Sequence, residues 1–410
     1  MKQYLYAALV FLVGSAAHAA ENVKETPVAS GDWTGAYAGV NAGGGFGTFR
    51  HPAVGNVSYD ETAGGFLGGV QAGYNWQSGR AVYGVEADIQ GSAVEGAYTQ
   101  FNLANTKVDW FGTLRARAGY APVDRMLLYG TAGLAYGKVR TDIANGILGS
   151  SRTKAGWTIG AGAEYALDAN WTFKTEYLYA DLGRSTIAPG YENDVAFHTV
   201  RVGLNYRFGA ADGAPREPAP AASAFDWSGG YIGVNAGGGF GTFQHPVDGG
   251  VRLDLTAGGF AGGVQAGYNW QCAQAVYGLE ADLQGSAVKG DFTIAGAPAP
   301  NTYISTRVGW FGTLRARAGY TPVDRVLVYG TGGLAYGKVE TDFDYGLYRA
   351  SRTKLGWTLG AGAEYALNAN WTLKSEYLYT DFGKSTVSAA IGIDNDVAFH
   401  LVRAGLNYRF

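Results

Sequence analysis

The chain has almost no cysteine, the residue with which many exported domains form stabilising disulfide bonds. It contains a single cysteine, Cys272, so no disulfide can form within the chain. Beyond the N-terminal region, no stretch approaches the ~20 consecutive apolar residues of a membrane-spanning helix. The net charge is only −3 at pH 7, which gives no basis for nucleic-acid binding. Neither disulfides nor apolar helices therefore hold this chain together.

The N-terminal region has the three parts of a secretory signal peptide. Lys2 supplies the basic segment, residues 5–13 are apolar, and residues 17–19 read Ala-His-Ala, a small-residue cleavage site. The apolar run is too short to act as a membrane anchor. We predict a signal peptide over residues 1–19, a periplasmic leader over residues 20–31, and export of the mature chain.

What the sequence does contain is a long internal repeat. Residues 32–49 recur at 226–243, and the ending at 205–208 recurs at 407–410. The offset between copies rises from 194 to 200 and then to 202, so the copies differ in length only near residues 92–106 and 181–195. We expect both stretches to be polar loops on one side of the membrane, since loop length changes easily. The repeat predicts two domains, 32–208 and 226–410, joined by an Ala/Pro-rich periplasmic linker over 209–225.

Each copy contains about eight segments in which apolar and polar residues alternate. In the segment 66–76, for example, Phe66, Val70 and Trp76 share one face, whereas Gln71 and Asn75 share the other. Alternation over ~10 residues is typical of transmembrane β-strands. A soluble β-sandwich shows the same alternation, but it would have to pack many Trp and Tyr side chains into a small interior. We therefore expect the apolar faces to contact lipid.

The tryptophans and the connections favour the same interpretation. Short turns are expected at 78–80, 122–125 and 168–170, and the intervening connections run to ten residues or more. Outer-membrane barrels have short periplasmic turns and long extracellular loops. All ten tryptophans fall near expected strand ends, five in each copy, and are predicted to form two aromatic girdles: Trp33, Trp76, Trp110, Trp157, Trp171, Trp227, Trp270, Trp310, Trp357 and Trp371.

Several motifs resemble one protein family. They are the opening Asp-Trp-Thr-Gly-x-Tyr-x-Gly-x-Asn (32–41), the segment Trp-Phe-Gly-Thr-Leu-Arg-Ala-Arg (110–117), Tyr-x-Tyr-x-Asp-x-Gly (177–183) and the ending Val-Arg-Val-Gly-Leu-Asn-Tyr-Arg-Phe (200–208). They resemble porin-family small outer-membrane immunogenic and haemin-binding proteins, whose barrel is similar to the eight-stranded domain of outer-membrane protein A. The resemblance implies an integral protein of the Gram-negative outer membrane. A tandem copy departs from this family, whose members normally have one barrel.

The end of the chain resembles a barrel assembly signal. Tyr408 and Phe410 close the final strand with Val402 and Leu406 in phase, and this resembles the C-terminal strand that the barrel assembly machinery reads. The same ending lies inside the chain at Phe208. We interpret each repeat as having once been a complete barrel.

The charges on the inner faces favour two eight-stranded up-and-down antiparallel barrels over the alternative of one sixteen-stranded barrel. Acidic and basic residues are nearly balanced, and in a narrow lumen they can pair and close the channel. Gly309 replaces Asp109 in the second copy, which predicts a slightly more positive second lumen. The predicted network comprises Glu86, Asp88, Asp109, Arg115, Arg117, Lys154, Glu164, Lys174, Glu176, Arg201, Glu280, Asp282, Arg315, Arg317, Lys354, Glu364, Lys374, Glu376 and Arg403.

Few residues suggest chemistry. Glu86 and Asp88 could form an acid/base pair, but cations expected on the same wall favour an ion-pair network. His198 and His400 fall on the lipid-facing phase with no serine at a recognisable spacing. His51 and His245 occupy matching places in the first expected loop and are candidates for haemin ligation, although one histidine per loop favours ordinary exposed loop histidines. We predict no enzyme, no metal site and no cofactor.

The expected function is structural. We predict a protein that supports envelope integrity and presents surface loops, with outer-membrane lipid, lipopolysaccharide and the assembly machinery as its partners. Two alternatives stay open: passive permeation of small solutes through the lumen, and binding of haemin or a host surface through the loops.

Overall fold

The structure is a computed structural model in which β-strands account for nearly all the residues described. It describes residues 32–53, 57–97, 104–123, 125–143, 148–208, 225–247, 251–295, 302–343, 348–388 and 392–410. Within these ranges there is no helix with the length and apolar character needed to cross a membrane. The predicted signal peptide and leader, and nearly all of the predicted linker, lie outside the described residues.

The first repeat forms one closed antiparallel barrel. Each strand pairs with the next along the chain, and β1 also pairs with β8, which closes the ring. Its strands are β1 (Gly35–Ala53), β2 (Val57–Ser78), β3 (Ala81–Ala97), β4 (Ala104–Val123), β5 (Met126–Ile143), β6 (Leu148–Ala166), β7 (Trp171–Ala188) and β8 (Tyr191–Arg207).

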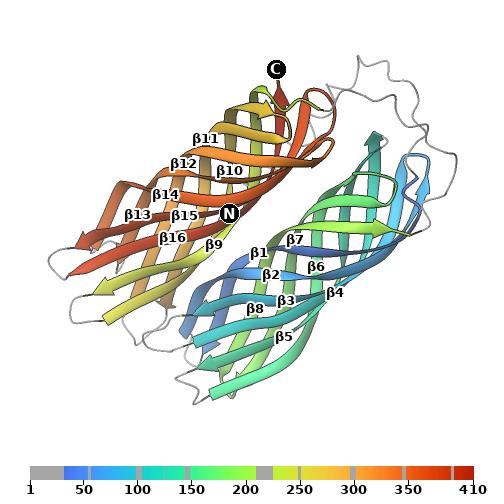
Figure 1. Cartoon of the computed structure of the whole chain (residues 1–410). Coiled ribbons are helices and arrows are strands. Elements are labelled where there is room, and N and C mark those ends of the chain that lie inside the picture. Colours follow the sequence, from blue (N-terminus) through green and yellow to red (C-terminus); the bar gives the residue numbers. More distant parts are fainter. Residues whose placement is uncertain are drawn as a thin grey trace.

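The second repeat forms a second closed barrel of the same design, with β16 pairing to β9 to close it. Its strands are β9 (Gly229–Val247), β10 (Val251–Cys272), β11 (Ala275–Ala295), β12 (Thr302–Val323), β13 (Val326–Phe343), β14 (Tyr348–Ala366), β15 (Trp371–Ser388) and β16 (Ile393–Arg409). The two barrels lie side by side (Figure 1). The fold prediction of two eight-stranded barrels is confirmed, and the alternative of one large barrel is wrong because each ring closes on itself.

The strands are much longer than the ~10 residues expected from alternation. They run from 17 residues in β3 to 22 in β2. We call the end of each barrel with the two- to four-residue connections (79–80, 124–125, 167–170) the turn end, and the opposite end the loop end. At the loop end, only residues 54–56, 98–103, 144–147 and 189–190 separate the strands of the first barrel. The expectation of loops of ten residues or more is therefore wrong, since the strands continue through these polar segments as paired hairpins. The stretches where the two copies differ in length do lie at one end, the loop end.

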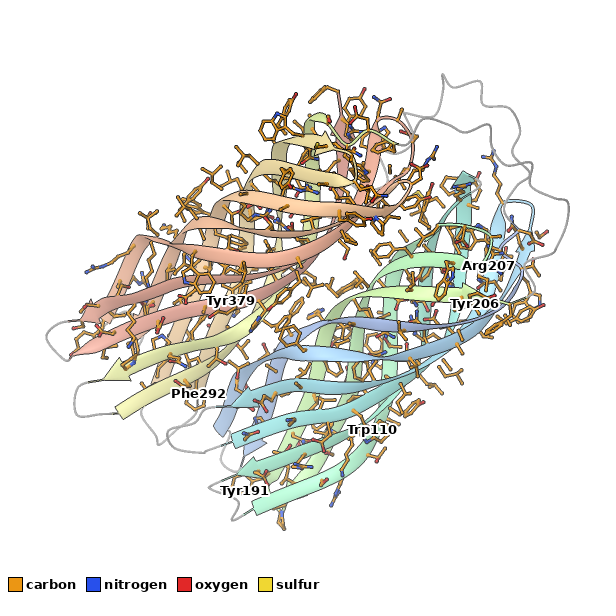
Figure 2. The ribbon with its side chains drawn as sticks, in the orientation of Figure 1. Trp110, Tyr191, Tyr206, Arg207, Phe292 and Tyr379 are labelled. Atoms are coloured by element: carbon orange, nitrogen blue, oxygen red, sulfur yellow. The ribbon has the colours of Figure 1, made fainter. Side chains whose placement is uncertain are left out.

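The two faces of the strands differ as the alternation predicts. Large apolar side chains on the outer face, such as Val70, Ile89 and Leu134, are exposed, whereas Gln71 and Arg115 on the inner face are buried. In Figure 2, side chains project from both barrels along their whole length, and Trp110 and Tyr206 mark the first barrel. An exposed apolar surface of this extent requires a lipid environment.

Candidate functional site: the charged interior of the barrels

The centre of each barrel is a network of buried charges. Period-two alternation turns every second side chain inward, so neighbouring strands aim charged groups at one point. In the first barrel Arg115 of β4 lies at the centre. Its Nη2 donates to Oδ2 of Asp88 at 2.9 Å and to Glu86, and its Nη1 donates to Oε1 of Glu176 at 3.0 Å. One guanidinium thus joins carboxylates from β3 and β7.

Three further cations complete this network. Arg117 donates to Glu164 at 2.7 Å. Lys174 donates to Glu86 at 2.9 Å. Arg201 of β8 donates through Nη2 to Asp88 at 2.7 Å and through Nε to Glu176 at 2.7 Å. The Coulomb energy of such pairs is large only where water is excluded, and all of these side chains are buried.

The network is electrically neutral. In the first barrel, four carboxylates (Glu86, Asp88, Glu164, Glu176) face four cations (Arg115, Arg117, Lys174, Arg201). The second barrel repeats the arrangement with the carboxylates Glu280, Asp282, Glu364 and Glu376 and the cations Arg315, Arg317, Lys374 and Arg403. The structure therefore brings together sixteen of the nineteen residues proposed for the two lumens.

Buried tyrosines extend the network beyond the predicted set. The Tyr37 hydroxyl donates to Glu86 at 2.7 Å and accepts from Arg117 at 2.8 Å. The Tyr129 hydroxyl donates to Glu176 at 2.8 Å, and the Arg117 guanidinium lies 4.0 Å from the centroid of its ring. Both tyrosines occupy inward positions, so the phase of β1 and β5 could have identified them.

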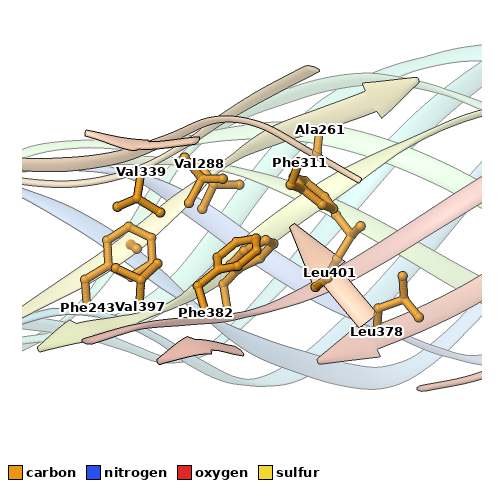
Figure 3. Close-up of a cluster of buried hydrophobic side chains, with 13 residues drawn as sticks. Phe243, Ala261, Val288, Phe311, Val339, Leu378, Phe382, Val397 and Leu401 are labelled. Atoms are coloured by element: carbon orange, nitrogen blue, oxygen red, sulfur yellow. The ribbon is translucent and has the colours of Figure 1, made fainter. Parts of the chain in front are cut away.

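Apolar layers lie above and below the charges. Toward the turn end, Trp33, Val82, Leu127 and Tyr129 form a buried cluster with Ala121 and Ala166. Toward the loop end, a larger cluster includes Phe49, Phe111 and Phe197. Figure 3 shows its counterpart in the second barrel, where Phe243, Phe311 and Phe382 fill the space between the walls. Each lumen is thus packed with side chains at three successive levels.

Three of the proposed residues lie outside this ion-pair network. Asp109 pairs with the half-exposed Arg140 at 3.0 Å, because a β-bulge between Val108 and Trp110 breaks the inward phase. Gly309 sits at the same bulge of the second barrel, so the expected excess positive charge in the second lumen is also wrong. Lys154 is buried near the loop end and donates to the backbone oxygen of Gly183 at 2.6 Å, and Lys354 donates to Gly383 in the same way.

The girdle prediction needs a correction at two tryptophans. Trp33 and Trp227 are 1% exposed and close the turn end of their barrels from inside. They precede the first strand of each barrel, so the alternation of that strand does not govern them. The other eight lie on strands and are exposed or partly exposed: Trp76, Trp110, Trp157, Trp171, Trp270, Trp310, Trp357 and Trp371.

The two candidate haemin ligands are not loop residues. His51 lies within β1 and His245 within β9, and both are buried. His51 shares a hydrogen bond with the Thr106 hydroxyl at 2.7 Å, and His245 shares one with Thr306 at 2.7 Å. Because the strands continue past the expected loop boundary, these rings point into the barrel and offer no open position to an external haem.

Comparison with known proteins agrees with the fold. The family described as "Outer membrane protein beta-barrel domain" matches twice, at residues 6–208 and 218–410. The 31 kDa outer-membrane immunogenic protein of Brucella melitensis is 54% identical over 226 residues, covering 49% of this chain and 92% of that protein. The 22 kDa outer membrane protein of Rhizobium leguminosarum bv. viciae is 35% identical over 193 residues, covering 45% of this chain and 83% of that protein.

Two of the similar solved structures each cover slightly less than half of this chain. Neisserial surface protein A is 19% identical with a TM-score of 0.29, covering 45% of this chain and 98% of that structure. The outer membrane protein OprG from Pseudomonas aeruginosa is 17% identical with a TM-score of 0.31, covering 46% of this chain and 99% of that structure.

Proposed function

Because this chain belongs to the outer membrane protein β-barrel family, we propose that it is a structural protein of the outer membrane that supports envelope integrity and presents its loop ends at the cell surface. The matching relatives are named outer-membrane proteins, and those from Brucella are named immunogenic. That name fits a role in which strand ends and loops face the exterior. The turn ends then face the periplasm.

The packing of the lumen carries this proposal. In the first barrel the charges of Glu86, Asp88, Arg115 and Arg201 neutralise one another, and apolar clusters lie on both sides of them. Ions could pass only if buried pairs separated and the apolar layers opened. Separating a buried ion pair costs several kcal/mol because each charge loses its partner. The packed interior therefore stabilises the barrel wall and is poorly suited to the passage of ions.

The same packing argues against catalysis at these carboxylates. A general acid or base needs a proton that it can exchange with a substrate. Glu86 instead accepts hydrogen bonds from Arg115, Lys174 and Tyr37, and it is buried in the barrel. We propose a non-catalytic role in which these residues hold opposite walls of the barrel together.

Conductance measurements test the proposal. The full mature chain, reconstituted in planar bilayers, is expected to give no stable porin-sized step, and liposomes that contain it should not swell in small sugars. A sixteen-stranded porin serves as the positive control. A large, stable conductance step would contradict the structural role and would support permeation of small solutes instead.

Partners of the proposed role follow from the outer surface. The exposed aromatic and aliphatic side chains suit contact with lipid and with the acyl chains of lipopolysaccharide. Phe410 is exposed beyond the end of β16, where an assembly machinery could read it together with Tyr408. Binding of haemin forms no part of the proposal, since His51 and His245 face inward. If the haem absorption shift is unchanged in the His51→Ala, His245→Ala double variant, these two histidines do not ligate haemin.

A further inference from the structure

One part of the outer face is buried although its residues point away from the lumen. Phe46 of β1 and Phe240 of β9 occupy outward positions, yet they are 3% and 1% exposed. Val40, on the same outward phase of β1, is 57% exposed. The second barrel covers Phe46 and the first covers Phe240, so a protein surface replaces lipid at this face.

The contacts across this face are self-complementary. Phe46 packs edge-on against Phe260 with ring centroids 4.7 Å apart, and Phe66 packs edge-on against Phe240 at 4.6 Å. Because Phe240 and Phe260 are the repeat equivalents of Phe46 and Phe66, the same patch meets itself. This is the pattern of an isologous interface in a twofold dimer, here built within one chain.

Glycines let the barrel walls approach closely at this face. A Cβ added at Gly44 would lie 2.0 Å from the ring of Phe240, and one at Gly238 would lie 2.4 Å from the ring of Phe46. At Gly64 the Cβ would lie 2.5 Å from the Ala257 oxygen of the other barrel. At the equivalent position, Gly258, the added Cβ would lie 2.5 Å from the Cβ of Phe46 and 2.9 Å from the Ala63 oxygen. Small residues at membrane-embedded contacts commonly serve this purpose.

The two outward histidines also belong to this face. The His198 ring shares a hydrogen bond with the Tyr177 hydroxyl at 2.8 Å, and it packs against Phe260 of the other barrel at 5.4 Å. His400 repeats this arrangement with Tyr377 and packs against Phe66 at 4.9 Å. An imidazole open to hydrocarbon would be costly. Cover by the partner barrel explains how a histidine is tolerated on the lipid-facing phase.

The symmetry is broken at the loop end, near the place where the second repeat is six residues longer than the first. The strand β3 ends at Ala97, which corresponds to Asp291, whereas β11 continues to Ala295. Residues 292–295 of β11 pair antiparallel with residues 58–61 of β2 in the other barrel. The Asp291 N–H also donates to the Thr62 hydroxyl at 3.0 Å. The longer β11 thus forms a short strand-to-strand clasp between the barrels, close to Phe292 in Figure 2.

We propose that the two barrels form one permanent pair in the outer membrane. Each barrel is the partner for the glycine-lined face of the other, and the longer end of β11 holds the pair together. The duplicated chain is in this sense a fused dimer whose interface replaces part of the lipid contact of each barrel.

Cross-linking of the full chain in lipid vesicles tests the pair. Asp60 and Thr293 lie directly opposite across the clasp, and opposite residues on antiparallel strands are within the Cα distance that a disulfide spans. The variant combines Asp60→Cys and Thr293→Cys with Cys272→Ser, and it carries a protease site within residues 209–224. After proteolysis and mild oxidation, the two halves are expected to stay joined until reductant is added. The control pair, Asp142→Cys with Thr293→Cys, places one thiol on β5 and should not join them.

A second variant tests the glycine-lined face itself. Adding Gly64→Leu and Gly258→Leu to the cysteine pair is expected to slow disulfide formation roughly tenfold or more. Gly130→Leu with Gly330→Leu is the matched control, since both glycines face outward on β5 and β13 with no partner-barrel atom among the neighbours of their Cβ positions. Heat-dependent gel mobility checks that each variant is folded. Failure of the Asp60/Thr293 pair to link, links only between separate chains, or an unchanged rate in the leucine variant would each overturn the proposal.

Discussion

At the scale of single residues, the effect of an ion pair depends on how far it is removed from water. Arg115 contacts carboxylates on β3 and β7 inside the first barrel, whereas Arg140 pairs with Asp109 at the surface. Both contacts are near 3 Å. Removing one partner of the buried contact leaves an unpaired charge without water, which is costly. The exposed contact contributes little, because water solvates both of its charges.

We expect Arg115→Met to lower the free energy of unfolding by roughly 3–5 kcal/mol, because it leaves buried carboxylates without their shared cation. Arg140→Met, whose side chain is 50% exposed, should change it by about 0–1 kcal/mol. Urea unfolding in lipid vesicles, followed by tryptophan fluorescence, measures both. Equal losses in the two variants would contradict the assigned role of the network.

Residue positions on the inner wall were largely predictable from period-two alternation, as for Glu86, Arg115 and Arg201. Asp109 was not, because a bulge reverses the phase locally and leaves no clear mark in the sequence. His51 was misplaced for a related reason. A polar segment reads as a loop, although hairpin pairing keeps it extended as part of β1.

At the scale of elements, the tight turns show how the repeats have diverged. Gly79 connects β2 to β3 with a φ of 60°, and its repeat equivalent, Ala273, connects β10 to β11 with a φ of 53°. The left-handed conformation is free for glycine but costs other residues roughly 1–2 kcal/mol. The second barrel therefore carries strain that the first does not.

Ala273→Gly is expected to stabilise the second barrel by about 1 kcal/mol, because glycine adopts this turn without strain. The reverse change, Gly79→Ala, should destabilise the first barrel by a similar amount. Unfolding midpoints of the two variants, compared with the unmodified chain, decide this. A loss of stability in Ala273→Gly would show that the alanine side chain contributes more than the strain costs.

At the scale of the whole molecule, the orientation of the strand faces decides the environment. Ile89 is outward and exposed on β3, between the levels of Trp76 and Trp110, which pair with Tyr83 and Gly91. Asn105 lies near the start of β4, five residues before Trp110 and closer to the loop end. In lipid, these two positions differ sharply in their tolerance of charge.

Ile89→Arg is expected to cost roughly 2–4 kcal/mol in lipid vesicles, because the guanidinium would enter the hydrocarbon. Asn105→Arg should cost about 0–1 kcal/mol, since it lies near or beyond the interface. Urea titrations of the two folded variants measure these changes in the free energy of unfolding. If Ile89→Arg left stability unchanged, the outer face would not contact lipid.

The sequence by itself determined the duplicated domain, the alternating faces and the balance of inward charge, because these depend on order along the chain and on a period of two residues. Only the tertiary structure decided that β1 pairs with β8 and β9 with β16 to close the barrels. It also decided that Trp33 is buried inside the turn end and that the second barrel covers Phe46. These features join residues far apart in sequence. Local alternation says which way a side chain points, but not what surface it meets there.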